Sequence, residues 1–509
     1  MTHLIGLDIG TTNLKAVAHD VERRSQTVYS CLTRTHRPRP GWAEYYADQI
    51  WADAVGLLRQ AVGAMHRPSE IAGIAVASMG EAGLLLDARG RAVTPIIAWF
   101  DSRTEPQSRW WKENVGREEV YSRTGHPVHP SFGVNKLMWF RDNEPDAFSQ
   151  GAHWLSAEDF VLFKLSGAFT TDYSIASRTM AFDVRSREWS VELLEKAGIA
   201  MDLMSPACAG GSVVGEVTPQ AASETGIPVG VPVVTGGHDH VCASLAVGAH
   251  QPGSLLDSTG TSESLILTSS EVLTSPEMCH QGFAQECHVL EDRYAVLAGF
   301  PVAGYLVDWV HGIGQRGEAQ VNYHFEEADE ITPGSDGLFF LPHLRGAGSP
   351  SLDTGCRGAL IGLSDAHGWG HMLRAAIEGV CYEIKSNVLA LERTLNTEVG
   401  AVHTVGKVSR SDLWLQLKAD ILGRTLTVAS ISEAAGTGAA LLAGLGAGVF
   451  ASPDEAVESL GAARAEIRPR REEALFYKMQ YDDVYSRIYP ALRDLYGVLA
   501  EQTKWHVGV

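Results

Sequence analysis

Two short segments of the sequence, half a chain apart, match each other at several positions. Residues 4–15 read LIGLDIGTTNLK, and residues 254–265 read SLLDSTGTSESL. An offset of 250 residues aligns a Gly-Thr-Thr turn at residues 10–12 with a Gly-Thr-Ser turn at residues 260–262. Each copy is an apolar strand, a turn of glycine and hydroxyl residues, and a second strand-like run, which predicts a tight β-hairpin. The repeat therefore indicates two duplicated α/β domains that face each other across a cleft.

The two turns have the composition of a phosphate-binding site. Their hydroxyl and backbone N–H groups suit phosphate oxygens, and glycine leaves room for a close approach. Asp8, just before the first turn, would repel phosphate unless a divalent cation lay between them, so it implies Mg²⁺ held largely through water. The sequence has no GxxxxGK[ST] loop and no GxGxxG that opens a helix after a strand. Phosphate chemistry is therefore expected from the paired hairpins.

One aspartate precedes the second turn by about twenty residues and follows a pair of glycines. Residues 231–240 read VPVVTGGHDH, an apolar strand followed by Gly236, Gly237 and an aspartate between two histidines. The glycines can adopt backbone angles that a side chain forbids, so they can present Asp239 at the end of the strand. The alternative is an aspartate that caps the small-residue helix predicted from residue 241. The paired turns favour the catalytic interpretation.

Length and charge set further limits. A chain of 509 residues exceeds what one hydrophobic core usually supports, so we predict domains over residues 1–248 and 249–509. The net charge of −20 disfavours nucleic acid or an anionic membrane as a partner. The chain begins with a strand-like segment and has no apolar run of membrane-spanning length, so neither a signal peptide nor a membrane helix is expected.

Cysteine usage suits a reducing cytoplasm, because the seven cysteines are scattered and odd in number. Two Cys-His pairs, at residues 279–280 and 287–288, have a spacing that could suit a metal. Their segment lacks tight CxxC turns, and its alternation suits a strand pair or a loop. We therefore favour a structural role for both pairs.

Polar side chains follow two predicted strands in the first half. The strand at residues 71–78 leads into residues 79–81, and a shorter strand leads into Trp99. Ligands of α/β proteins lie beyond the carboxyl ends of strands, so these residues are candidates to contact a small polar substrate. An aromatic ring beside a carboxylate is a usual way to hold a polyol. Equally, Trp99 could belong to the core, and Asp101 and Arg103 could form a surface ion pair.

Helical periodicity recurs along the rest of the chain. Ser156 has the position of an N-cap before one such segment. The small residues of another, at 436–448, would let a second helix or a flat ring pack very close. A last helical stripe, at residues 472–502, is expected to break at Pro490. The other helices are predicted over residues 43–65, 132–145, 153–170, 370–395 and 411–422.

Two further stretches resemble the signatures of a known family. Residues 132–143 read FGVNKLMWFRDN, with a K-L-x-W-F core, and residues 358–378 read GALIGLSDAHGWGHMLRAAIE. Together with the two hairpins and Asp239, they make nearly the whole chain resemble the FGGY family of carbohydrate kinases, which includes xylulose and glycerol kinases. The resemblance implies a two-domain actin-like ATPase fold, in which two ribonuclease-H-like domains close over ATP in the cleft between them.

The resemblance also implies roles for individual residues. Asp239 matches the general base and, with Asp8, the metal site. The first domain would carry most of the sugar site, and the second most of the nucleotide site. Lys407 replaces a glycine that the family usually has, so the adenine contacts are expected to differ. The implied nucleotide-binding residues are Thr11, Thr12, Asn13, Lys15, Gly260, Thr261, Ser262, Gly304, Gly406, Lys407 and Ser411.

The implied sugar pocket departs from two patterns of the family. Residues 79–82 read Met-Gly-Glu-Ala, where xylulose kinases typically have Gln-Met-His-Gly and glycerol kinases Gln-Arg-Glu-Thr. Glu81 thus matches the glutamate of glycerol kinases, whereas Gly80 lacks the neighbouring side chain and is expected to enlarge the pocket. The other implied sugar-binding residues are Met79, Trp99, Ser131, Asp239 and His240. We predict a small acyclic substrate, a pentulose such as xylulose being favoured over a tetritol or a hexulose.

The predicted reaction moves a phosphoryl group from ATP, bound with Mg²⁺, to a hydroxyl group whose proton Asp239 accepts. A small-molecule sugar or polyol is the implied partner; nucleic acid and membrane are not implied, and frequent dimers in the family suggest a homodimer. An actin-like ATPase of the chaperone or filament type is one alternative, although that class lacks the two kinase signatures. A catalytically lapsed sugar-binding sensor is the other.

Overall fold

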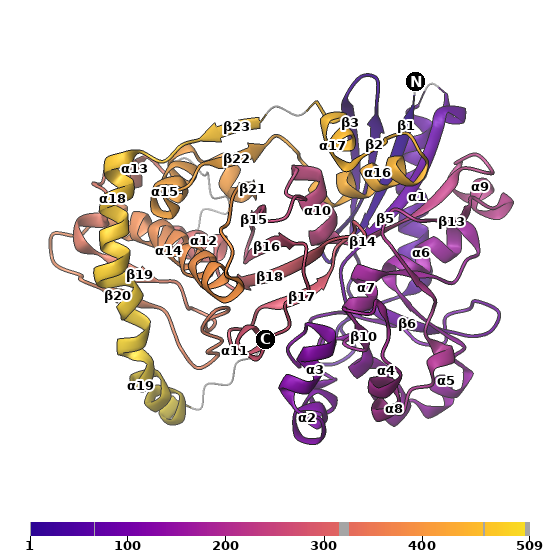
Figure 1. Cartoon of the computed structure of the whole chain (residues 1–509), viewed down its shortest axis with the longest axis horizontal. Coiled ribbons are helices and arrows are strands. Elements are labelled where there is room, and N and C mark those ends of the chain that lie inside the picture. The colour runs from indigo at the N-terminus through magenta and orange to yellow at the C-terminus, as the bar shows by residue number, and fades with distance from the viewer. Residues whose placement is uncertain (1, 66, 315–324, 462–463, 504–509) are drawn as a thin grey trace.

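The computed structural model describes residues 2–65, 67–314, 325–461 and 464–503, and it has two lobes side by side (Figure 1). The main sheet of the first lobe consists, in spatial order, of β13 (Val213–Glu216), β14 (Pro232–His238), β5 (Ile71–Ser78), β1 (His3–Ile9), β2 (Asn13–Asp20) and β3 (Ser25–Leu32). The sheet of the second lobe consists of β17 (Ala284–Cys287), β18 (Tyr294–Phe300), β16 (Glu263–Ser269), β15 (Leu255–Thr259), β21 (Val402–Gly406), β22 (Leu426–Ala429) and β23 (Arg464–Ile467).

Both sheets follow the same plan. β1 and β2 form an antiparallel hairpin around residues 10–12, and β15 and β16 form the second hairpin around residues 260–262. β1 runs parallel to β5, as β15 does to β21. The orders β3-β2-β1-β5-β14 and β18-β16-β15-β21-β22 therefore correspond strand by strand. The two hairpins and the duplicated α/β fold are confirmed, while the domain boundary after residue 248 stays a prediction.

Two helices join the sheets. α10 (Asp239–Val247) follows β14, whereas α16 (Ala434–Gly446), although late in the sequence, packs on β1, β5 and β14 of the first sheet. A Cβ on Gly438 would lie 1.9 Å from the carbonyl oxygen of Cys242 in α10, so glycine alone permits this approach. A Cβ on Gly6 would lie equally close to α16, 1.9 Å from the oxygen of Gly436. The close partner of this small-residue helix is thus another helix together with a strand.

The predicted helices are present, with ends that differ by a few residues. Ser156 caps one of them in a capping box, because its hydroxyl accepts the N–H of Asp159 and the Asp159 carboxylate accepts the N–H of Ser156. The helices are α1 (Ala47–Gly63), α4 (Gly133–Asn143), α6 (Ala157–Ser166), α14 (Trp369–Leu395) and α15 (Asp412–Leu422).

The interruption predicted at Pro490 in the last helical stripe is wrong. Pro490 lies inside α19 (Ser486–Thr503), and the break falls earlier, at a π-helical turn over Tyr481–Tyr485 that follows α18 (Arg471–Gln480). The rings of Tyr481 and Tyr485 both stack on Tyr382 of α14, at centroid distances of 6.2 and 4.6 Å. Packing on α14 therefore sets the position of the wider turn.

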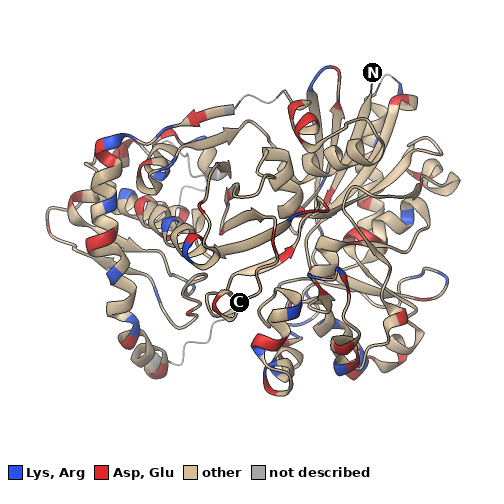
Figure 2. Cartoon of the chain, in the orientation of Figure 1, with Lys and Arg blue, Asp and Glu red and all other residues tan. Residues whose placement is uncertain are grey.

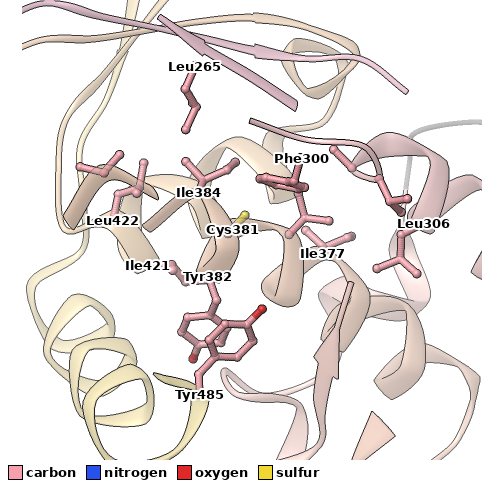
Figure 3. Close-up of a cluster of buried hydrophobic side chains, with 14 of the residues drawn as sticks. Leu265, Phe300, Leu306, Ile377, Cys381, Tyr382, Ile384, Ile421, Leu422 and Tyr485 are labelled. Carbon is pink, nitrogen blue, oxygen red and sulfur yellow. The ribbon is translucent and has the colours of Figure 1, made fainter. Parts of the chain in front are cut away.

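α14 is the centre of the second lobe's core (Figure 3). Leu265 of β16 and Phe300 of β18 approach it from the sheet, and Leu422 approaches it from α15. On its far side, Tyr382 faces Tyr485. The sheet that carries the second hairpin is thereby anchored to the longest helix of the lobe.

Buried His343 is expected to make stability depend on pH. Its Nε2–H donates to Glu383 Oε1 at 2.9 Å. Burial alone lowers the pKa of His343, but Glu383 outweighs it and raises this pKa from 6.5 to about 10. Because the folded pKa is the higher one, the stabilisation is complete below pH 6.5 and is lost as the pH rises towards 10.

We therefore expect the free energy of unfolding to fall by an amount on the order of a few kcal/mol across that range. Urea titrations at several pH values measure this fall. His343→Gln should flatten it, whereas His280→Gln, at a histidine whose side chain is 70% exposed, should not. An equally steep fall in His343→Gln would contradict the assignment.

Acidic and basic side chains are interspersed along the outer helices of both lobes (Figure 2). Within the described ranges, no helix combines the length and the apolar character needed to cross a membrane.

Cys279 lies in α11 (Pro276–His280) and Cys287 in β17, so the two Cys-His pairs belong to different elements.

Candidate active site

Two glycines shape the approach of β14 to Asp239. The pairing of β14 with β5 shifts register between Thr235 and Gly237, and Gly237 has a φ of 139°. A Cβ on Gly236 would lie 2.0 Å from the carbonyl oxygen of Val76, and one on Gly237 would lie 2.5 Å from Ser174 Oγ. The predicted backbone role is thus confirmed for Gly237, while Gly236 is required for close packing.

Gly237→Ala is expected to lower the free energy of unfolding by roughly 1–3 kcal/mol, because the new Cβ combines an unfavourable φ with a clash. It should also lower turnover, since Asp239 follows two residues later. Thermal unfolding and a phosphorylation assay measure both effects. Gly56→Ala, in the middle of α1 with nothing within 4 Å of the added Cβ, is the matched control and should not destabilise the protein. An unchanged Gly237→Ala protein would contradict this account.

Asp239 opens α10 with a partly accessible carboxylate. Its side chain is 24% exposed, its Oδ1 accepts the backbone N–H of His240 at 2.7 Å, and His238 Nε2 lies 3.4 Å from the same oxygen. The N-cap of α10 is His238, with no side-chain capping bond. Asp239 therefore does not cap the helix in the manner of the alternative interpretation, and the helix N-terminus favours its negative charge.

Asp8 lies on β1 within electrostatic reach of Asp239. Burial, reinforced by the charge of Asp239, raises the pKa of Asp8 to about 7. Lys15 Nζ lies 3.7 Å from Asp8 Oδ2 and 2.6 Å from Glu433 Oε2, so the predicted phosphate ligand Lys15 is paired with two carboxylates. Glu433 immediately precedes α16 and was not predicted. Asp8 Oδ1 has no hydrogen-bond partner in the part of the chain that the structure describes.

The first turn contacts the predicted sugar side. The indole N–H of Trp99 donates to Thr11 Oγ1 at 3.0 Å, and the Thr11 hydroxyl lies 3.9 Å from Met79 Sδ. Trp99 is 42% exposed, so it is not a core residue. Thr12 accepts the N–H of Thr33 through its carbonyl group. The first hairpin therefore contacts two segments: Met79, which follows β5, and Trp99, which precedes α2 (Glu105–Asn114).

The second turn gathers several predicted nucleotide-binding residues. Gly304, the first residue of α12 (Gly304–Gly314), donates its N–H to the carbonyl of Gly260 at 3.0 Å, and the carbonyl of Thr261 accepts two further N–H groups nearby. Gly406 pairs with Thr259 and has a φ of 97°, and a Cβ there would lie 2.3 Å from the Thr259 oxygen. These residues thus surround one turn.

Two further predicted nucleotide contacts, Lys407 and Ser411, follow Gly406 in the sequence. The hydroxyl of Ser411 accepts the N–H of Trp414 at 3.3 Å and caps α15, and the residue is only 3% exposed. Ser411 is therefore already engaged in the fold. The side chain of Lys407 lies outside the described part of the structure.

A buried ion pair contacts the residue that directly precedes the second turn. Lys418 Nζ lies 2.6 Å from Asp257 Oδ2 and 2.7 Å from Thr259 Oγ1, and both charged side chains are fully buried. Thr404 donates a further bond to Asp257 at 2.9 Å. Since Thr259 directly precedes Gly260, this group fixes the base of the turn.

The sugar side holds a charge that the sequence did not reveal. Glu81 has a φ of 59°, its carbonyl accepts the ammonium of Lys136 at 2.5 Å, and its carboxylate pairs with Arg178. A Cβ on Gly80 would lie 3.0 Å from Arg178 Nε and 3.3 Å from the His238 ring. The pocket enlargement expected at Gly80 is therefore wrong, because Arg178 and His238 fill that space.

The remaining predicted positions are also located. Ser131 Oγ lies 2.9 Å from His129 Nδ1, and the ring of His240 lies 5.6 Å from that of His238. Asp101 and Arg103 are not a surface pair: both are buried, and the guanidinium bonds both Asp101 oxygens and stacks on Trp42. Both side chains therefore belong to the packed interior, two and four residues after Trp99.

Comparison with known families assigns both halves of the chain. The N-terminal domain of the FGGY family of carbohydrate kinases matches residues 3–246, and the C-terminal domain of the same family matches residues 255–447. The chain belongs to the FGGY family of carbohydrate kinases. It is thus an ATP-dependent carbohydrate kinase, and the family matches favour this function over the chaperone-type alternative.

Relatives of this FGGY kinase span its whole length. The xylulose kinase of Bacillus subtilis is 28% identical over 97% of this chain and 98% of its own, and the gluconokinase of the same organism is 28% identical over 91% of each. The crystal structure of the xylulose kinase from Rhodospirillum rubrum superimposes with a TM-score of 0.89 at 28% identity, and covers 97% of this chain and 100% of its own. These matches confirm the two-domain fold.

Besides Glu433, the sequence does not mark three residues on the sugar side of this FGGY kinase's candidate site. Arg178 follows a short helix with no local motif to mark it, and Glu286 lies in a segment interpreted only for its cysteines. The sequence marks His238 only as a neighbour of Asp239. The single available signal was that adjacency, because the partners of all three residues are remote in the sequence.

Proposed function

We propose that this FGGY kinase phosphorylates a hydroxyl group of a small acyclic sugar or polyol, with a pentulose such as xylulose favoured and Asp239 as general base. The observation that carries the proposal is the position of Asp239, partly exposed at a helix N-terminus and close enough to Asp8 for their charges to interact. The first phosphate turn contacts Trp99 and Met79, which supports a sugar bound beside the phosphates.

Asp239 would accept the proton of the attacking sugar hydroxyl group. The oxygen of that hydroxyl group bonds to the γ-phosphorus while the bond between the γ-phosphorus and the leaving ADP oxygen breaks. The His240 N–H orients the carboxylate, and the turns at residues 10–12 and 260–262 offer N–H and hydroxyl groups to the phosphate oxygens. Most of the rate enhancement is expected from alignment and charge stabilisation.

The residues present fit a divalent cation. Asp8 has one carboxylate oxygen without a partner among the described residues, and its charge is disfavoured by burial and by Asp239. Asp8 and Asp239 would hold Mg²⁺, in keeping with a cation that binds one or two carboxylates and substrate phosphates. When bound, the ion neutralises part of the charge on the triphosphate. Lys15, paired with Asp8 and Glu433, orients Asp8.

An assay that couples ADP release to a colour change tests the proposal against tetritols, pentuloses, pentitols, hexuloses, gluconate and glycerol. We expect the largest increase with a pentulose. Phosphorylation of gluconate alone would overturn the choice of substrate, and ADP release that no sugar or polyol increases would overturn the proposed reaction.

A further inference from the structure

The sugar side of the site contains a residue from the second lobe. Glu286 lies on β17, the edge strand of the second sheet, and is fully buried. Its neighbours in β17 bond to the first lobe, because Gln285 N–H donates to the Gly125 carbonyl at 2.7 Å and Cys287 N–H donates to Ser177 Oγ at 3.3 Å. The edge strand is thus docked on the first lobe on both sides of Glu286.

The two carboxylate oxygens of Glu286 serve different partners. Oε1 accepts His238 Nδ1–H at 2.6 Å, and Oε2 accepts an N–H of Arg178 at 3.0 Å. Each partner leads to a different part of the proposed site. Arg178 continues to the carboxylate of Glu81, and His238 Nε2 lies 3.4 Å from Asp239 Oδ1. One side chain therefore connects a predicted sugar ligand with the proposed base.

We propose that Glu286 is a positioning residue of the kinase reaction, which orients Glu81 through Arg178 and Asp239 through His238. This inference rests on the function proposed above. The proposal makes the sugar site depend on the second lobe, because Glu286 belongs to that lobe. The four residues that it connects, Glu81, Arg178, His238 and Asp239, all belong to the first lobe. Such a role needs no contact between Glu286 and the sugar.

Gly80 makes this arrangement possible. A Cβ at this position would lie 3.0 Å from Arg178 Nε and 3.3 Å from the His238 ring, which is closer than ordinary van der Waals contact. Both side chains therefore occupy the room that the glycine leaves, between Glu81 and Asp239. Their place is fixed by packing as well as by charge.

The first test is Glu286→Gln, which preserves shape but removes the charge that both partners contact. We expect kcat to fall and the KM for the sugar to rise, by about 10- to 100-fold in kcat/KM, with the KM for ATP nearly unchanged. Glu378→Gln is the matched control, because Glu378 is a buried, arginine-paired glutamate in the core of the second lobe. It should leave both kinetic constants unchanged even if it lowers the melting temperature.

The two connections are separated by single variants. Arg178→Lys keeps the charge but loses the planar fork, so it should act mainly on the KM for the sugar. His238→Gln keeps a donor for Glu286 but has no second ring nitrogen near Asp239, so it should act mainly on kcat. The separate effects of Arg178→Lys on the KM for the sugar and of His238→Gln on kcat also test the proposal if Glu286→Gln fails to fold. A merely structural role would shift stability without dividing KM from kcat.

The proposal is overturned if Glu286→Gln has wild-type constants, if Glu378→Gln reproduces its defect, or if neither Arg178→Lys nor His238→Gln shows the expected division. Wild-type protein is assayed first with xylulose and the other sugars. Absence of any turnover would count against the proposed function instead, and calorimetric binding of xylulose to wild type and Glu286→Gln would still test the connection through Arg178.

Discussion

Asp239→Asn is expected to lower the rate of sugar phosphorylation by roughly 10²- to 10⁴-fold, because an amide cannot accept the proton of the attacking hydroxyl group. ATP binding should persist, since the predicted phosphate contacts come from the two hairpins. Coupled ADP release measures the first effect, and calorimetry with a non-hydrolysable ATP analogue measures the second.

The matched control is Asp412→Asn, at an exposed aspartate that likewise stands in the first turn of a helix. It should retain full activity. If Asp239→Asn kept more than about a tenth of the wild-type rate, the assignment of the base would be wrong. A defect in Asp412→Asn of the same size would point to a general loss of folding.

Lys418→Met is expected to cause the largest loss of stability, about 3–5 kcal/mol, because it leaves the fully buried carboxylate of Asp257 without a counter-charge. The KM for ATP should also rise, since the Lys418 ammonium bonds Thr259 at the base of the second turn. Urea unfolding measures the stability, and initial rates measure the KM.

Two comparisons make this result specific. Replacing both partners, as in Lys418→Met with Asp257→Leu, should recover part of the stability, because the Asp257 carboxylate is then no longer buried without its counter-charge. Lys196→Met removes a lysine whose ion pairs are solvent-exposed, and it should leave stability nearly unchanged. A loss in Lys418→Met no larger than that of Lys196→Met would contradict the interpretation of the pair.

The pattern of strands, turns and glycines was predictable because each of these features depends on residues that are neighbours in the sequence. An apolar run, a Gly-hydroxyl turn and a second run suffice for a hairpin, and their repetition after 250 residues suffices for a duplicated fold. The capping box at Ser156 was equally local. The error at Pro490 arose because the π-helical turn depends on stacking against Tyr382, which is about a hundred residues earlier in the chain.

The candidate site was predictable only in part, for the same reason. Its turns and Asp239 belong to local motifs, whereas Trp99 is distinguished from a core residue only by its exposure in the folded structure. Gly80 was misinterpreted because the side chains that fill its space come from positions 178 and 238. No periodicity in the sequence indicates such a contact.

The sequence by itself determined the two hairpins, the placement of Asp239 after a strand that ends in two glycines, and the family. Only the tertiary structure decided which charges meet: Arg178 reaches Glu81 across 97 residues and Glu286 across 108. The physical reason is that backbone preferences act between neighbours, whereas a buried ion pair forms only where packing brings its members together and excludes water.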